Sequence, residues 1–420
     1  MSKILIRAGQ NPLKEYEPYD STIKMGGNSG NLLYANGVAR TLASSKNTLS
    51  FGGFKSHTAA NKQEWIDKVN SQYDHYVMPM ANSFREGMTE SLKGFTEIIK
   101  GLEIPVTVVG IGAQATATSY KNKSFSMAST GGRKKLDENK TNEHDRVVLD
   151  FCLAVLEKSK SIGVRGDFTK DYLVYLGIPE NKVRVIGCPS LFTWGPDHRI
   201  LDKKNNTFIG KNQNLSQDSC LSMNIDYRLA GIERMIYANI HRYPNLTSPS
   251  QDSKSARMII EGKEHYDLTK VNLGSPIHTK HSMFVRNNVI YYPNPWGWIN
   301  DLSKKEFVFG TRLHGNISGI LGGTPAHLLT HDARTNELAN FHGIPHTSYS
   351  ESQEFLAEDL FINTDYTEFN DLMPTRFNNF LDFLHENDLV TIYDTDKGNA
   401  TSFDQKVSKL KLIEPIYPNN

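Results

Sequence analysis

The sequence predicts an α/β protein with two domains, in which buried strands alternate with amphipathic helices. Three observations support this fold class. With 420 residues, the chain exceeds the usual size of a single core. Short apolar runs alternate with stretches of helical periodicity in both halves. A polar, turn-forming stretch at residues 192–219 separates the halves, so we place the first domain at residues 1–205 and the second at residues 206–420.

The first half contains a strand, a helix and a strand in succession. The segments YDHYVMPMANS (73–83) and IPVTVVGIGAQ (104–114) are apolar runs that end in small or polar residues, as buried strands do. Between them, apolar residues recur at helical spacing over residues 84–102. The alternation continues with a helix at 145–160, a strand at 161–167, a short helix at 168–178 and a strand at 182–192.

The second half repeats this alternation. Its expected strands and helices lie in the segments 220–228, 283–294, 306–323, 324–334 and 337–344. A helix with a wide apolar face and an interrupting proline follows at 367–388, and we assign this helical segment to the second domain. The polar segments 115–140 and 244–280 are interpreted as exposed loops, including the serine-rich stretch that begins at residue 247.

Composition excludes several classes of protein. The 47 Lys and Arg residues nearly balance the 46 Asp and Glu residues, so no global field favours nucleic acid or an anionic membrane. No apolar run reaches the length of a membrane-spanning helix, and the first twenty residues lack the apolar stretch of a secretory signal, so we expect a cytoplasmic protein. Three distant cysteines fit neither a disulfide framework nor a metal site, and HTKH at 278–281 is interpreted as a solvated loop. We therefore expect no metal.

Three segments have the form in which α/β proteins bind anions: an apolar strand, a turn of small or polar residues, and a helix start. In FVFGTRLHGNISGILGG, Arg312 and His314 lie in the turn. Arginine offers a rigid fork for phosphate or carboxylate, and histidine suits proton transfer near neutral pH. The alternative is structural: Arg312 binds carbonyls or a carboxylate, and His314 merely opens the helix.

The other two segments have the same form. In SIGVRGDFTKDYLVYLGI, Arg165 leaves a strand just before a helix, although a surface ion pair with Asp167 or Asp171 would also explain it. MGGNSGNLLYANGVARTL places Gly27 and Asn28 in a glycine-rich turn before a helix that we expect from about Asn31. This turn lacks the Lys and Ser/Thr of a P-loop, and a tight turn before a core helix is the simpler interpretation.

Taken together, these segments resemble the polysaccharide pyruvyl transferase family. The resemblance is carried, in chain order, by GGNSGNLL, PVTVVGIGAQ, SIGVRGDFTKDYLVYLGI with VRVIGCPSLF, and GTRLHGNISGILGGTPAHLLTHDARTNELANFHGIP, over about residues 20–345. It implies two Rossmann-like domains in a GT-B-like arrangement, with a cleft between them that binds phosphoenolpyruvate. No cofactor is implied, since phosphoenolpyruvate is the donor substrate.

The resemblance also implies roles for individual residues. Arg165 and Arg312 correspond to the family's anion-binding arginines, and His314 to its general acid/base. Leu313, Gly27, Asn28 and Arg334 are expected at the donor, where Asn28 and Arg334 could instead cap helices. The family's early turn often reads Gly-Asn-x-Gly-Asp, whereas this chain has Asn31 at the last position, which an asparagine could still use to cap the helix.

The implied reaction moves the pyruvyl group of phosphoenolpyruvate onto two hydroxyls of a sugar in a surface polysaccharide or its precursor. A lipid-linked acceptor would bring the protein to the cytoplasmic face of the inner membrane, and the basic loop at 131–135 is a candidate contact, although a solvated charged loop is the simpler interpretation. Two alternatives stay open: a GT-B-type glycosyltransferase that uses a nucleotide sugar, and a noncatalytic glycan-binding protein.

Overall fold

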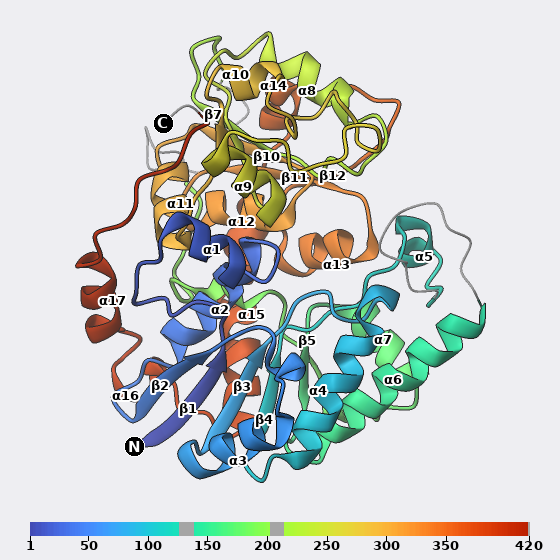
Figure 1. Ribbon diagram of the computed structural model, residues 1–420, viewed down its shortest axis with the longest axis vertical. Coiled ribbons are helices and arrows are strands. Elements are labelled where there is room, and N and C mark those ends of the chain that lie inside the picture. The colour runs from blue at the N-terminus through green and yellow to red at the C-terminus, as the bar shows by residue number, and fades with distance from the viewer. Residues whose placement is uncertain (126–137, 202–213, 419–420) are drawn as a thin grey trace.

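The computed structural model describes residues 1–125, 138–201 and 214–418 and contains two parallel α/β units, one above the other in Figure 1. The first sheet has the strand order β2-β1-β3-β4, and the second has the order β12-β11-β10-β7. Every pair of neighbouring strands in both sheets is parallel. The predicted α/β fold class is confirmed.

Strands of the first unit are β1 (Ser2–Arg7), β2 (Asn47–Gly52), β3 (His75–Pro79), β4 (Val106–Val109), β5 (Ile162–Val164) and β6 (Val183–Val185). Its helices are α1 (Pro18–Lys24), α2 (Gly30–Thr41), α3 (Lys62–Gln72), α4 (Thr89–Gly101), α5 (Ala117–Lys121), α6 (Glu138–Leu156) and α7 (Asp167–Tyr175). Short 3-10 turns are η1 (Ser56–Thr58), η2 (Glu86–Met88), η3 (Glu180–Lys182) and η4 (Pro189–Phe192). The parallel pair β5–β6 joins the edge of the first sheet through a bridge between Ile111 and Val164.

Strands of the second unit are β7 (Leu221–Asn224), β8 (Ser248–Pro249), β9 (Val289–Ile290), β10 (Phe307–Gly310), β11 (Ala326–Thr330) and β12 (His346–Ser348). Its helices are α8 (Ile232–Ile240), α9 (Ser253–Glu261), α10 (Ser282–Val285), α11 (Pro295–Leu302), α12 (Leu313–Leu321), α13 (Ala333–His342) and α14 (Ala357–Ile362). The pair β8–β9 joins this sheet through a bridge between Ser222 and Thr247.

The chain ends with α15 (Thr367–Glu386), α16 (Ile392–Thr395) and α17 (Thr401–Ser408), which contact the first unit. Glu386 binds the Arg184 guanidinium with two bonds of 2.8 Å, and Asp404 binds Arg40 at 2.8 Å. Figure 1 shows α15 descending among the blue and green elements, with α16 and α17 beside β2. Helix α15 continues through Pro374. The expected boundary near residue 205 falls outside the described residues.

Contacts between α2 and α12 join the two units next to the site. Buried apolar side chains of both helices, including Leu33, Tyr34, Leu313 and Ile317, belong to one continuous core. Because parallel strands end at the same edge of a sheet, the turns after β3 and β4 of the first unit face those after β7, β10 and β11 of the second. The chain therefore brings its predicted anion-binding turns to the junction of the two units.

Candidate active site

A cavity of about 310 Å³ lies between the two units. The first unit contributes the glycine-rich turn before α2 and the ends of β3 and β4, and the second unit contributes the turns after β7 and β10 and the start of α13. Its lining residues are Gly26, Gly27, Asn28, Asn31, Ala81, Asn82, Arg85, Gln114, Asp226, Tyr227, Arg228, Gln251, Asp252, Thr311, Arg312, Leu313, His314 and Arg334. The expected cleft between the units is present, and six of the seven expected site residues line this cavity.

Arg312 is placed by the turn between β10 and α12. Gly310 has φ +134°, and a Cβ at this position would lie 2.0 Å from the main-chain oxygen of Asn224, so only glycine fits here. The Arg312 main-chain N–H donates to Asn224 Oδ1 at 2.7 Å, and its Nε donates to the Ile225 carbonyl at 2.8 Å. These bonds orient the Arg312 guanidinium, and Arg312 lines the cavity.

His314 lies in the first turn of α12 and contacts both units. Its Nε2 is 3.7 Å from Cys188 Sγ, and its ring centroid is 5.9 Å from that of Tyr34. Gly30 at the start of α2 packs directly against the imidazole. Burial, together with the charges of Arg165 and Arg334, holds the pKa of His314 well below its ordinary value. The imidazole is therefore neutral at pH 7 in the unliganded protein.

Arg165 is the expected site residue that does not line the cavity. Its side chain is 1% exposed, with Nε donating to the Gly110 carbonyl at 2.7 Å and the guanidinium 5.9 Å from the Tyr34 ring. The alternative interpretation as a surface ion pair with Asp167 or Asp171 is wrong, because the guanidinium bonds to main-chain carbonyls in the interior. The charge of Arg165 helps to hold the pKa of His314 below its ordinary value.

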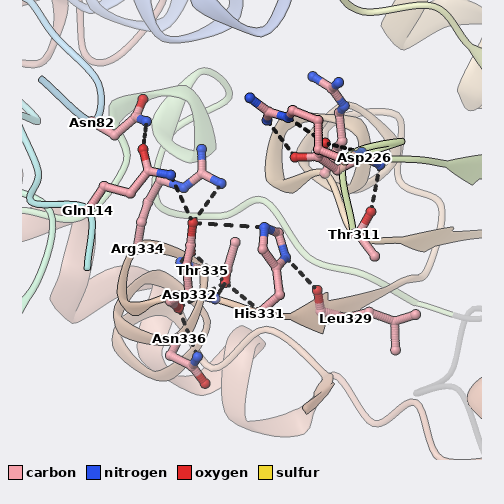
Figure 2. Close-up of polar contacts among 12 residues, drawn as sticks. Asn82, Gln114, Asp226, Thr311, Leu329, His331, Asp332, Arg334, Thr335 and Asn336 are labelled. Carbon is pink, nitrogen blue, oxygen red and sulfur yellow. Dashed lines mark hydrogen bonds and ion pairs between the residues drawn. The ribbon is translucent and has the colours of Figure 1, made fainter. Parts of the chain in front are cut away.

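Arg334 projects from the first turn of α13 and does not cap that helix. Asp332 is the cap: its Oδ1 accepts from the Thr335 N–H at 2.8 Å, and its Oδ2 is 3.2 Å from Arg334 Nη2, as Figure 2 shows. Burial alone would raise the pKa of the Asp332 carboxyl, but Arg334 and His331 hold it below its ordinary value. Arg334 Nε is buried and, among the described residues, has no hydrogen-bond partner.

Gly27 and Asn28 form part of a loop that joins the units across the cavity. Gly27 has φ +86°, and Asn28 Oδ1 accepts from the Gly30 N–H at 2.9 Å. The Ser29 N–H donates to the Gln251 carbonyl at 2.8 Å. Asn31 Nδ2 donates to the carbonyls of Met25 and Gly26, and α2 starts at Gly30, so Asn31 lies inside the helix and does not cap it.

Sequence reasoning missed two further arginines of the cavity, Arg85 and Arg228. Arg228 donates two hydrogen bonds to the Asp226 carboxylate, from Nε at 2.8 Å and from Nη2 at 2.6 Å. Burial would raise the pKa of Asp226, yet the charges of Arg312 and Arg228 hold it well below its ordinary value. Burial and the neighbouring Arg334 and Arg228 lower the pKa of Arg85 to about 10. Arg228 ends one expected strand segment and Arg85 lies two residues after another, and this position is the signal that could have found them.

The serine-rich stretch from residue 247 was interpreted as surface, and this prediction is wrong. Ser250 and Gln251 are 7% and 3% exposed, and Asp252 caps α9 through bonds of 3.1 Å from the N–H groups of Lys254 and Ser255. Gln251 Nε2 is buried without a partner among the described residues. The stretch is polar because it lines a polar cavity.

Together these side chains make an anion site. Among the described lining residues, four arginines face two aspartates, so the walls carry a net positive charge with His314 neutral. Three buried donors, Arg85 Nε, Arg334 Nε and Gln251 Nε2, have no protein partner within the described ranges. The guanidinium groups of these arginines can donate charge-assisted hydrogen bonds to an anionic ligand.

The described part of the chain has no cluster of side chains that could hold a metal ion. No group of three or more His, Cys, Asp or Glu side chains there has the arrangement of a metal site. In HTKH, His281 caps α10 by accepting from the Met283 N–H at 3.2 Å. No described helix is both long and apolar enough to cross a bilayer.

Comparison with known proteins gives one family. The profile described as polysaccharide pyruvyl transferase matches residues 28–333. No curated protein matches the sequence. Similar solved structures include an uncharacterised protein of Klebsiella pneumoniae, with 12% identity, a TM-score of 0.40, and coverage of 83% of this chain and 93% of that chain. HepE of Anabaena, solved with UDP and glucose, has 11% identity and a TM-score of 0.41, and the match covers 97% of this chain and 99% of that chain. UDP-GlcNAc 2-epimerase of Methanocaldococcus jannaschii, solved with UDP-GlcNAc and UDP, has 13% identity and a TM-score of 0.38, and the match covers 89% of this chain and 92% of that chain.

The matched stretch contains the glycine-rich turn from Asn28, Arg165, and the Arg312–His314 turn, and it ends one residue before Arg334. It covers well over half of the chain, and the chain belongs to the polysaccharide pyruvyl transferase family.

Proposed function

We propose that this protein transfers the pyruvyl group of phosphoenolpyruvate to two hydroxyls of a sugar, in a surface polysaccharide or its lipid-linked precursor. The products are a cyclic ketal and inorganic phosphate. The observation that carries this proposal, beside the family, is the cavity whose described lining holds four arginines and two aspartates. A donor with a phosphate and a carboxylate close together needs at least two cationic groups, and Arg312 and Arg334 face the same cavity.

The donor's charge also explains how a neutral histidine becomes an acid. In the unliganded protein, burial and the nearby arginines favour neutral His314. A bound trianion or dianion offsets the positive charge of the lining, so donor binding raises the pKa of His314 and favours its protonated form. His314 then gives this proton to the methylene carbon of phosphoenolpyruvate while an acceptor hydroxyl adds to the central carbon and loses its own proton. A second hydroxyl displaces phosphate and closes the ketal.

Arg165 supports the same step from the interior. Its guanidinium is held by the Gly110 carbonyl and lies 5.9 Å from the Tyr34 ring, and its charge lowers the pKa of His314. We assign it a positioning and electrostatic role: it keeps His314 neutral until the donor arrives. The cytoplasmic location and membrane contact belong to the proposal as well, and the basic loop at residues 131–135 lies outside the described residues.

The test is phosphate release from phosphoenolpyruvate by the purified protein, with and without β-galactosides, N-acetylmannosamine-containing glycans and lipid-linked disaccharides. We expect acceptor-dependent release that falls by about 10²–10⁴-fold in His314→Ala while phosphoenolpyruvate still binds. His241→Ala is the matched control, because His241 is exposed and outside the cavity. Binding of a nucleotide sugar without binding of phosphoenolpyruvate would contradict the proposal and favour a glycosyltransferase.

A further inference from the structure

A second cavity, of about 810 Å³, lies beside the donor cavity, and we name it the α5 pocket. Its walls come from α5 and the residue after it, the segment after Arg228, and the carboxyl ends of β11 and β12. The two cavities share one side, since Leu229 and Ala230 directly follow Arg228 and His331 precedes Arg334 by three residues. A substrate in the α5 pocket therefore lies next to the donor.

The lining of the α5 pocket differs from that of the donor cavity. Among the described residues that line it, Lys121 is the only Lys or Arg and Glu351 the only carboxylate, so it lacks the positive charge of an anion site. Amides and hydroxyls dominate instead, with the rings of Tyr120 and Tyr349 as apolar surfaces that carry a polar group. Hydroxyl-rich, uncharged ligands match such a surface, and the volume lies within the range of small-molecule sites.

Hydrogen bonds from the second unit fix the opposite walls of the α5 pocket. The Tyr349 hydroxyl donates to the Ala230 carbonyl at 2.8 Å, joining the end of β12 to the segment after Arg228. On the other side, Asn340 Nδ2 of α13 donates to the Tyr120 hydroxyl at 3.0 Å and attaches α5. The pocket is thus formed before any ligand arrives, which lowers the cost of binding.

His331 lies on the side that the two cavities share. Its Nδ1 is 3.5 Å from the Leu329 carbonyl, and its Nε2 is 3.8 Å from Asp332 Oδ2, as Figure 2 shows. A carbonyl oxygen only accepts hydrogen bonds, so in the tautomer that donates from Nδ1 to Leu329 the Nε2 atom carries a lone pair that can accept a proton.

Asp332 also connects His331 with the donor side. The same Oδ2 atom is 3.2 Å from Arg334 Nη2 and 3.4 Å from Gln114 Nε2, and both of these residues line the donor cavity. Figure 2 shows His331 and Arg334 both approaching the Asp332 carboxylate. A single carboxylate therefore sets the positions of a base in one cavity and a cation in the other.

From this geometry we infer that the α5 pocket binds the glycan acceptor and that His331 is the base that takes the proton of the attacking hydroxyl. The role of His331 rests on the proposed pyruvyl transfer. As the acceptor oxygen bonds to the central carbon of phosphoenolpyruvate, its proton passes to His331 Nε2, and His314 gives its proton to the methylene carbon. When the second hydroxyl displaces phosphate, its proton leaves with the phosphate, and His331 returns its own proton to water.

The experiment uses the full chain, phosphoenolpyruvate, and a neutral β-galactoside or N-acetylmannosamine-containing disaccharide that the wild-type protein accepts. Ser348→Trp fills the α5 pocket from an exposed position on β12, and Ser71→Trp on exposed α3 is its matched control. We expect Ser348→Trp to raise the acceptor KM at least tenfold, with the Kd for phosphoenolpyruvate unchanged. If Ser348→Trp fails to fold, Thr118→Trp on exposed α5 replaces it.

His331→Gln tests the base. We expect kcat to fall by about 10²–10⁴-fold, with the phosphoenolpyruvate Kd unchanged and the acid limb of the kcat/KM profile lost, because that limb reports a base that must be unprotonated. His241→Gln should match wild type. A wild-type acceptor KM in the folded pocket variant overturns the pocket, and a wild-type acid limb in His331→Gln overturns the base.

Failure of the proposed function gives a different pattern. If wild-type protein neither binds phosphoenolpyruvate nor releases phosphate, the transfer reaction and the role of His331 fall together. The pocket is then judged by ligand-observed NMR with the same disaccharides: binding that Ser348→Trp abolishes and Ser71→Trp keeps supports a glycan site. Absence of binding, or binding that survives Ser348→Trp, overturns it.

Discussion

Replacing Gly30 by alanine should displace His314 without touching the cavity's charges. A Cβ on Gly30 would lie 2.7 Å from His314 Cβ and 2.8 Å from its Cγ and Nδ1, whereas ordinary contacts begin at 3.4 Å. One partner must therefore move by about 0.7 Å. Gly30 begins α2 and His314 lies in the first turn of α12, both within the continuous core, so neither main chain can yield easily.

The expected magnitude follows from this displacement. Overpacking of a buried contact costs about 1–3 kcal/mol, and alanine recovers about 0.5–1 kcal/mol relative to glycine in a helix. A shift near 1 Å of a reacting group lowers turnover by about 10²-fold. We therefore expect Gly30→Ala to lose about 10–100-fold in phosphate release, with a modest loss of stability and nearly unchanged affinity for phosphoenolpyruvate.

The assay compares Gly30→Ala with Gly53→Ala, since nothing lies within 4 Å of a Cβ on Gly53. Phosphate release, phosphoenolpyruvate affinity and the midpoint of thermal unfolding are measured for both variants. The control should match or slightly exceed the wild-type midpoint. Wild-type turnover in Gly30→Ala would refute the reasoning, because it would show that the Gly30 contact does not hold His314 in place.

Three further outcomes are expected. Arg312→Lys should weaken phosphoenolpyruvate binding by about 10–100-fold in calorimetry, because an ammonium cannot both bond the Ile225 carbonyl and present a fork to the donor. Burial lowers the pKa of His75 to about 4 from an ordinary value of 6.5, so the native state binds fewer protons and stability falls as pH drops from 6.5 toward 4; His75→Gln should flatten that dependence in thermal unfolding. Burial raises the pKa of Glu337 to about 8 from 4.5, so the contribution of this carboxyl to the free energy of unfolding is full below pH 4.5 and is lost as the pH rises toward 8. Glu337→Gln should therefore gain stability relative to wild type over that pH range in thermal unfolding. A stability difference between the two proteins that stays constant with pH would contradict this account.

Local sequence patterns predicted the elements well where a strand runs directly into a turn. The segment around Arg312 and His314 was expected to end a strand near Gly310 and begin a helix near Gly315, and β10 ends at Gly310 while α12 begins at Leu313. Apolar periodicity and glycine placement are short-range properties, so they can be read from neighbouring residues.

Polar segments were predicted less well. Residues 247–252 have the composition of an exposed loop, yet Ser250 and Gln251 are buried. A polar residue is buried when partners from elsewhere in the chain satisfy it, or when a ligand site needs it, and neither condition is visible in local sequence. Arg165 shows the same limit, since a surface ion pair with Asp167 was as consistent with its neighbours as the interior position that it occupies.

The sequence by itself determined the α/β class, the family, and the identity of the turns that bear Gly27, Arg165 and Arg312, because each depends on residues close together in the chain. Only the tertiary structure decided which of these residues share a cavity, because that depends on packing between α2 and α12. It brought Arg85 and Arg228 to the donor cavity, left Arg165 out of the cavity lining, and put Asp332 in contact with both Arg334 and His331. Charges spread over the length of the chain act on one another only once folding has brought them within a few ångströms.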